Sequence, residues 1–178
     1  DNGAVPKIAF VRAGIGPANN YHSWNSGSTT ISLATWHFVA VSCSDGDVDT
    51  TPVFNLDGTR FNATSETDSG TGAATGGGYD LRVGRRADGA IQMDGRIAYL
   101  HIYNRSLSLG ELNQIRLFPG SIQNGLFVFY PLWGSTSPEP DLSGNKNHGT
   151  VTGAIKGKDE PPINGIFQVP KPELIGSF

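Results

Sequence analysis

Three aspartates at alternate positions, Asp45, Asp47 and Asp49, are the residues whose type and spacing best fit metal chemistry. Calcium binds six to eight oxygen ligands, and such a ladder of carboxylates could supply about two or three of them. The alternative is a solvated acidic turn that keeps one end of a sheet soluble. No glycine and glutamate complete an EF-hand loop here, which favours the acidic turn and leaves calcium as the candidate cofactor.

A second oxygen-rich stretch contains Asp141, Ser143, Asn145 and Asn147. Ordinary turn chemistry also explains it, because Asp and Asn side chains hydrogen-bond the backbone two residues further on. We favour the turn over a ligand site for this stretch.

The histidines and the cysteine provide no recognisable metal or disulfide pattern. Histidines occur at positions 22, 37, 101 and 148, without the HxH or HExxH spacing of metal sites. Cys43 is the only cysteine, so an intrachain disulfide and a cysteine-based zinc site are both excluded. It lies in an apolar segment and is predicted to be a small buried hydrophobe.

Composition limits the class of protein. The chain has 178 residues, the size of one domain, with 24 Gly, 11 Pro and only 16% charged residues. This profile is typical of an all-β domain with many tight turns. The net charge of −3 argues against nucleic-acid partners and anionic membranes, and no apolar run reaches the ~20 residues that span a bilayer.

The elements that must position these residues follow from periodicity. Residues 97–103 alternate as a strand, and Ser108 and Glu111 form a capping box that begins a short helix near 109–117. Asp57-Gly58 is the strongest hairpin signal. Other strands are predicted at these segments: 5–11, 21–24, 29–33, 36–43, 53–61, 80–83, 90–103, 126–132 and near 149–154. Residues 36–43 are apolar on both faces and are placed at the centre of a covered sheet, whereas residues 62–78 are predicted to be a loop.

Several of these segments resemble laminin G-like domains, members of the concanavalin A-like jelly-roll superfamily. The resemblance covers roughly residues 5–117 and rests on four motifs: WHFVAV at 36–41, FNLDGT at 54–59, LRVGR at 81–85 and GRIAYLHIYNRSLSLGE at 95–111. It implies a two-sheet antiparallel jelly-roll sandwich with one short helix.

The order of the motifs departs from the family. Residues 125–153 resemble the segment that normally opens such a domain, yet here they follow the closing helix. They could supply the missing strands as a permutation, begin a second partial repeat, or reflect a missing N-terminal portion. Because unpaired strand edges are avoided, we favour completion by residues 125–155 or by a neighbouring chain. The predicted domain is therefore 1–158, followed by a Pro-rich extended arm at 159–178.

Jelly-roll lectins bind sugars by stacking them on an exposed ring beside polar loop residues. Tyr21, Trp24 and Asn25 form one such candidate set, and Trp133 with Asn145 forms another. Either tryptophan could equally be a core residue.

Catalysis is disfavoured on sequence grounds. Related β-glucanases carry an E-x-D-x-x-E or E-x-D-x-E strand, and the nearest matches, Glu66 with Asp68 and Glu139 with Asp141, lack the third carboxylate. No G-x-S-x-G elbow is present either.

We therefore predict a non-enzymatic surface recognition or adhesion module that binds a glycan or cell-surface ligand. Similarity of the C-terminal extension to phage and environmental viral proteins places it on a virion or cell surface, extracellularly. The alternative is a structural assembly or decoration protein, whose arm and open strand edges contact neighbouring subunits through self-association. An unrecognised glycosidase is the least favoured alternative.

Overall fold

The computed structural model describes residues 6–13, 21–43, 50–68, 81–85, 92–132, 137–158 and 161. Within these residues the chain forms eight strands, paired antiparallel in three small sheets, and one helix. The predicted all-β class, the antiparallel jelly-roll sandwich and the single short helix are confirmed.

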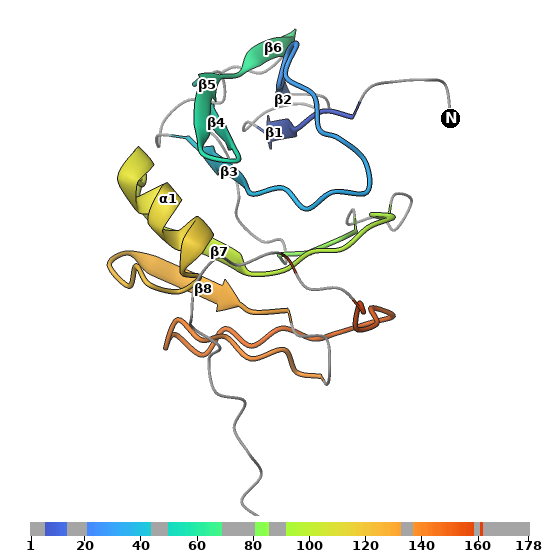
Figure 1. Cartoon of the computed structure of the whole chain (residues 1–178), viewed down its shortest axis with the longest axis vertical. Helices are drawn as coiled ribbons and strands as arrows, with labels where there is room; N and C mark the ends of the chain where they lie inside the picture. The colour runs from blue at the N-terminus through green and yellow to red at the C-terminus, as the bar shows by residue number, and fades with distance from the viewer. Residues whose placement is uncertain are drawn as a thin grey trace, which may run out of the picture.

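The first sheet has the order β1-β2-β6 and joins segments far apart in sequence (Figure 1). Its strands are β1 (Ala9–Ala13), β2 (Tyr21–Asn25) and β6 (Thr64–Asp68). The prediction of a loop throughout 62–78 is wrong at β6. This polar strand pairs through its backbone with β2, which a hydrophobic pattern cannot reveal.

The second sheet has the order β3-β4-β5, with β3 (Val39–Ser42), β4 (Val53–Leu56) and β5 (Thr59–Asn62). The Asp57-Gly58 hairpin is confirmed, because Leu56 pairs with Thr59 on either side of it. The central position predicted for residues 36–43 is wrong: β3 lies at the edge of its sheet, and Val39 is 43% exposed.

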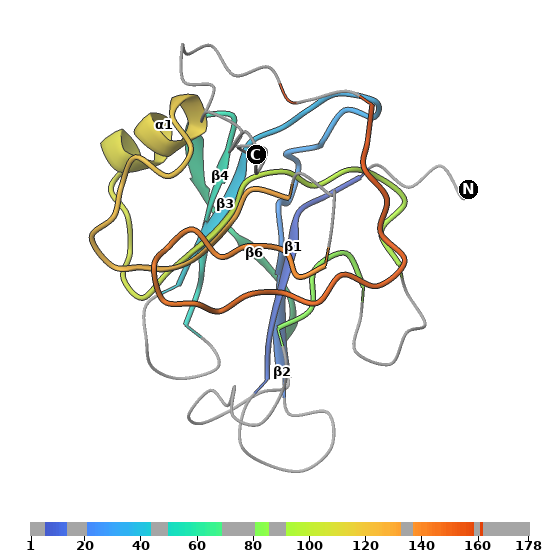
Figure 2. The same cartoon turned by 90° about the horizontal axis from the view of Figure 1, so that it is seen from below.

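The third pair joins β7 (Leu100–Tyr103) to β8 (Leu126–Tyr130). β8 is the segment that resembles an opening strand, and here it lies beside the strand that precedes the helix. In Figure 1 residues 137–158 run beneath β8, and in Figure 2 they cross the near side of the molecule.

Several predicted strands are shorter than expected or absent. Residues 29–33 and 81–83 form no strand, and the strand near 149–154 is reduced to one bridge between Glu139 and Gly149. Of the strand predicted over 90–103, the described residues 92–103 form a strand only from Leu100, apart from one bridge between Gln92 and Arg85. Tyr99, with a left-handed φ of 55°, breaks the extended backbone immediately before it.

Helix α1 (Leu109–Leu117) begins with the predicted capping box. The Ser108 hydroxyl accepts a hydrogen bond from the Glu111 N–H at 3.2 Å, and the Glu111 carboxylate accepts one from the Ser108 N–H at 2.9 Å. The carboxylate is also paired with Arg105 at 2.6 Å. The Arg105 guanidinium and the Ser108 donors hold the pKa of Glu111 low, at about 2.

Two clusters of buried apolar side chains hold these layers. One joins the first two sheets around Ile8, Trp24 and Phe54. The other packs α1 through Leu107, Leu112 and Ile115 against half-buried side chains of β3 and β7. The helix therefore fixes the distance between the second sheet and the β7–β8 pair.

Candidate functional site

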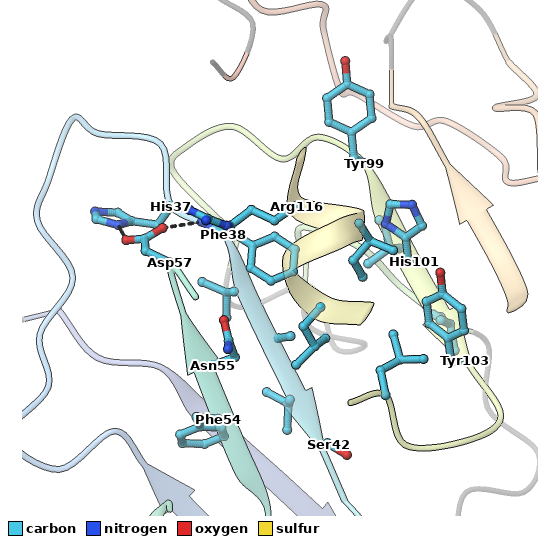
Figure 3. Close-up of a pocket in the computed structure, with 18 of the residues that line it drawn as sticks. His37, Phe38, Ser42, Phe54, Asn55, Asp57, Tyr99, His101, Tyr103 and Arg116 are labelled. Carbon is cyan, nitrogen blue, oxygen red and sulfur yellow. Dashed lines mark hydrogen bonds and ion pairs between the residues drawn. The ribbon is translucent and has the colours of Figure 1, made fainter. Parts of the chain in front are cut away.

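A groove of about 1240 Å³ runs along the outer edge of β3, between that strand, residues 93–107 and α1 (Figure 3). Val39 and Val41 of β3 are 43% and 39% exposed there, although they are apolar. Ser42 and Ser106 connect the two sides of the groove through a hydroxyl–hydroxyl bond of 3.0 Å. This bond joins the end of β3 to the segment before α1, and the second core cluster packs the same two sides together at Ala40 and Leu107.

One end of the groove is built on the β4–β5 turn. The backbone N–H of Asp57 donates to the Phe38 carbonyl, and the Asp57 carboxylate accepts from the Phe38 N–H, both at 2.9 Å. The second oxygen of that carboxylate lies 2.6 Å from Nδ1 of His37. These three contacts pin the hairpin turn to the start of β3.

Ser32 completes a chain of contacts with this pair. Its hydroxyl lies 2.9 Å from Nε2 of His37, so the order Ser–His–Asp is that of a hydrolase triad. The Asp57 side chain is 45% exposed, whereas a triad aspartate is buried. Its bonds to Phe38 give this carboxylate a sufficient role in holding the hairpin.

Behind the turn, two buried nitrogens lack a hydrogen-bond acceptor in the described part of the chain. They are Nδ2 of Asn55, a residue that is 1% exposed, and Nε of Arg116 on α1. The Asn55 carbonyl oxygen accepts from the Gly58 N–H at 3.1 Å, which directs the amide nitrogen away from the turn. Arg116 reaches from the helix toward the same turn (Figure 3).

The register of the sheet places Asn55 on the groove side. Ala40, Asn55 and Arg60 lie opposite one another on β3, β4 and β5 and therefore share one face. Ala40 packs against the α1 cluster, so this face is the one turned toward the helix. Phe54 points to the opposite face, into the first core cluster. Val41, which pairs with Phe54, and Val39 point to that face too, so they line the groove where it passes round the edge of β3.

The sugar site predicted on β2 is not formed as expected. Trp24 is fully buried and stacks on His22 with ring centroids 4.0 Å apart, so of its two predicted roles it has the core one. The Asn25 carbonyl oxygen accepts from the Gly27 N–H at 2.7 Å, which closes a local turn. Tyr21 belongs to β2, but its side chain lies outside the described residues.

Asn145 belongs to a turn that covers the outer edge of β8. Its amide nitrogen donates to the carbonyls of Leu126 and Phe127 at 3.1 and 3.0 Å. In the same turn Asp141 accepts from the backbone N–H of Phe129 at 2.9 Å. The predicted turn chemistry therefore describes this stretch, and the amide of Asn145 is occupied by the backbone.

The buried carboxylate of Asp141 organises that turn. It also accepts from the N–H groups of Ser143 at 3.0 Å and Asn147 at 2.9 Å, and from the Ser143 hydroxyl at 2.8 Å. Burial acts to raise its pKa, but these hydrogen bonds together hold the pKa below the ordinary value of a carboxyl group.

The predicted calcium ligands Asp45, Asp47 and Asp49 lie outside the described residues, as does Trp133. Within the described ranges, no cluster of three or more His, Cys, Asp or Glu side chains could hold a metal ion. Calcium therefore stays a prediction.

A family model described as the concanavalin A-like lectin/glucanases superfamily matches residues 5–113. The chain belongs to this superfamily. The match confirms the predicted laminin G-like resemblance and ends before β8. Neither a curated protein nor a solved structure matches the chain.

Laminin G-like domains of the superfamily are carbohydrate-binding or adhesion modules, generally non-enzymatic and typically extracellular. No helix in the described ranges has the length and apolar character needed to cross a bilayer.

Sequence reasoning missed Asn55 and Arg116 as groove residues. The Asp57-Gly58 signal located the turn they surround, but only the packing of α1 brings Arg116 to it.

Proposed function

We propose that this chain is a non-enzymatic glycan-recognition module of a virion or cell surface, and that the glycan binds in the groove beside β3. The observation that carries the proposal is the groove itself: an open site on a lectin-like fold, lined by both apolar and hydrogen-bonding groups. Small-ligand sites combine apolar walls with a few placed polar groups in this way.

The groove has both kinds of group that saccharides use. Phe38 and Tyr103 are half-buried rings in its wall, and sugar rings pack their apolar faces on aromatic side chains. His37, Asn55 and Arg116 supply polar groups for hydroxyls at the turn end. Phe38 and Tyr103 therefore replace the buried Trp24 as the rings on which the sugar is proposed to stack.

A glycan array, probed with the whole protein with and without calcium, tests the recognition role. We expect binding to a restricted group of glycans, and calcium dependence only if the Asp45, Asp47 and Asp49 turn takes part. If no glycan on the array binds, either with or without calcium, the proposal would be overturned.

A bulky substitution locates the site. Val41→Trp places a large ring at an exposed position that lines the groove, and should reduce glycan binding at least tenfold. Val11→Trp is the matched control, because Val11 is 61% exposed on β1 and does not line the groove. Equal loss in both variants would contradict the location.

A further inference from the structure

The groove is cationic although the whole chain is acidic. Among the described residues that line it are the arginines Arg12, Arg60, Arg96, Arg105 and Arg116, and one carboxylate, that of Asp57. The chain as a whole has a net charge of −3. The lining thus carries a local excess of positive charge, which attracts anions into a concave site.

The single carboxylate offsets only part of this excess. Its oxygens accept from the Phe38 N–H and lie against His37, so they are directed into the hairpin, and its one negative charge faces two arginines at the turn end, Arg60 and Arg116. Arg105 is paired at 2.6 Å with Glu111, which does not line the groove. Arg60 and Arg116 lie at the turn end, beside the buried Asn55.

Three donors gather at that end. Arg60 is the cross-strand neighbour of Asn55 on the groove face. Arg116 lies against Gly58, since a β-carbon there would be 3.7 Å from its Cζ, and the Gly58 N–H in turn binds the Asn55 carbonyl. Among the residues that the structure describes, neither Asn55 Nδ2 nor Arg116 Nε has an acceptor. A buried donor left unpaired costs about 1–3 kcal/mol, so an acceptor from a ligand would be favourable here.

The chemistry of the donors selects the ligand. Guanidinium groups present a planar pair of N–H donors that matches the two oxygens of a carboxylate. Resting on the proposed glycan recognition, we infer that the ligand is an acidic saccharide, with a carboxylate held at the end formed by Arg60, Arg116 and Asn55. Asn55 Nδ2 is buried, so contact with it requires the neighbouring side chains to move aside on binding. The sugar ring then lies along the groove toward Phe38.

Calorimetric titration with one saccharide in two forms tests this inference. The probes are an oligogalacturonate and its fully methyl-esterified form of equal length, which keeps the sugar and removes the charge. We expect the free acid to bind at least tenfold more tightly, and the difference to shrink as salt is raised from about 50 to 300 mM because salt screens the attraction.

Single-charge variants assign the residues. Arg60→Gln should weaken binding of the acid about tenfold and leave that of the ester unchanged. Arg116→Gln should weaken binding of the acid more than that of the ester, because this side chain also binds sugar hydroxyls. Lys7→Gln removes the same charge at an exposed residue that does not line the groove, and should have no effect. Arg60 is exposed, so its variant is informative even if Arg116→Gln fails to fold.

The outcomes separate this inference from the proposed function. Equal binding of acid and ester, with no effect of either Arg variant, would overturn the acidic ligand and leave glycan recognition intact. If neither the acid nor the ester binds, and no glycan on the array binds, glycan recognition itself would be overturned. Equal or tighter binding of a single-stranded oligonucleotide with the same number of charges would also overturn the inference, since the groove would then select charge and not sugar.

Discussion

The ring of His101 lies nearly flat on that of Phe129 across the β7–β8 pair, with centroids 4.3 Å apart and planes inclined by 11°. The backbone N–H of Gly120 donates to Nε2 of the same histidine at 2.9 Å. That nitrogen must be unprotonated to accept the bond. Burial lowers the pKa of His101 from 6.5 to about 4, and the backbone of Tyr99 opposes this only in part.

This histidine should make the stability of the protein pH-dependent below neutrality. The unfolded chain takes up a proton near pH 6.5 and the folded chain only near pH 4. The unfolded state therefore binds more protons in this window, and the free energy of unfolding falls as pH is lowered, by roughly 3 kcal/mol in all. Urea unfolding between pH 7 and 4 measures the slope. In His101→Gln, which keeps an acceptor for Gly120, the slope should flatten; an unchanged slope would assign the effect to other groups.

Gly120 lies against the stacked rings of His101 and Phe129 and leaves room for them. Gly120 has a φ of +78°, and a β-carbon on it would lie 2.6 Å from the Phe129 ring. Gly120→Ala should therefore destabilise by about 3 kcal/mol, through both the left-handed backbone and the clash. Gly144→Ala separates the backbone effect from the clash, because Gly144 has a φ of +89° but a β-carbon on it would have nothing within 4 Å. This variant should lower the free energy of unfolding by only about 1 kcal/mol. Comparable urea midpoints for the two variants would contradict the contact.

Removal of the Asp141 carboxylate should disrupt the turn beside β8. Asp141→Ala leaves the N–H groups of Phe129, Ser143 and Asn147 without this acceptor, at a cost of about 2–4 kcal/mol in the free energy of unfolding. Asp141→Asn keeps one acceptor oxygen and should lose about half as much. Amide hydrogen exchange at Phe129 should accelerate in both. Exchange that stays at the wild-type rate would show that the edge is held by other contacts.

Truncation tests whether residues 125–158 belong to the domain. β8 contributes several buried side chains, namely Leu126, Val128, Phe129 and Tyr130. A chain ending at residue 121 should therefore not unfold cooperatively on heating, whereas a chain ending at residue 158 should keep the wild-type transition. Cooperative melting of the shorter chain would place the domain boundary after α1.

The contacts of Ser32, His37 and Asp57 should be structural. We expect no hydrolysis of p-nitrophenyl acetate above the rate of the Ser32→Ala variant. Asp57→Ala should lower the free energy of unfolding by about 1–3 kcal/mol, because the Phe38 N–H loses its acceptor. Ester hydrolysis that disappears in Ser32→Ala would overturn the non-enzymatic assignment.

Structural features were predictable from the sequence where all of their interacting residues lie close together in the chain. Ser108 and Glu111 satisfy each other within one turn of helix, and Asp57-Gly58 closes a hairpin between neighbouring strands. Both features are therefore readable from a few consecutive residues. The buried role of Trp24 was one of two predictions, since a tryptophan packs equally well in a core or beneath a ligand.

Long-range pairing was not predictable in the same way. The polar residues of β6 pair with β2 through backbone groups, which all residue types share. The groove depends on where α1 packs over β3, and Asn55 and Arg116 are separated by sixty residues of chain before that packing brings them to one turn. A local pattern contains no information on such a contact.

The side-chain cap on β8 also limits how copies of the chain can join. The Phe127 carbonyl, which a further strand would need at this edge, already accepts from Asn145 and Ser143. The Phe129 N–H already donates to Asp141, and the Phe129 carbonyl accepts from the Leu142 N–H. Continuous sheets grow by adding backbone to backbone, and here that position is filled by side chains of the 141–145 turn and by the Leu142 N–H. The segment that resembles the family's first strand thus ends its sheet, and polymerisation by strand addition is blocked at β8.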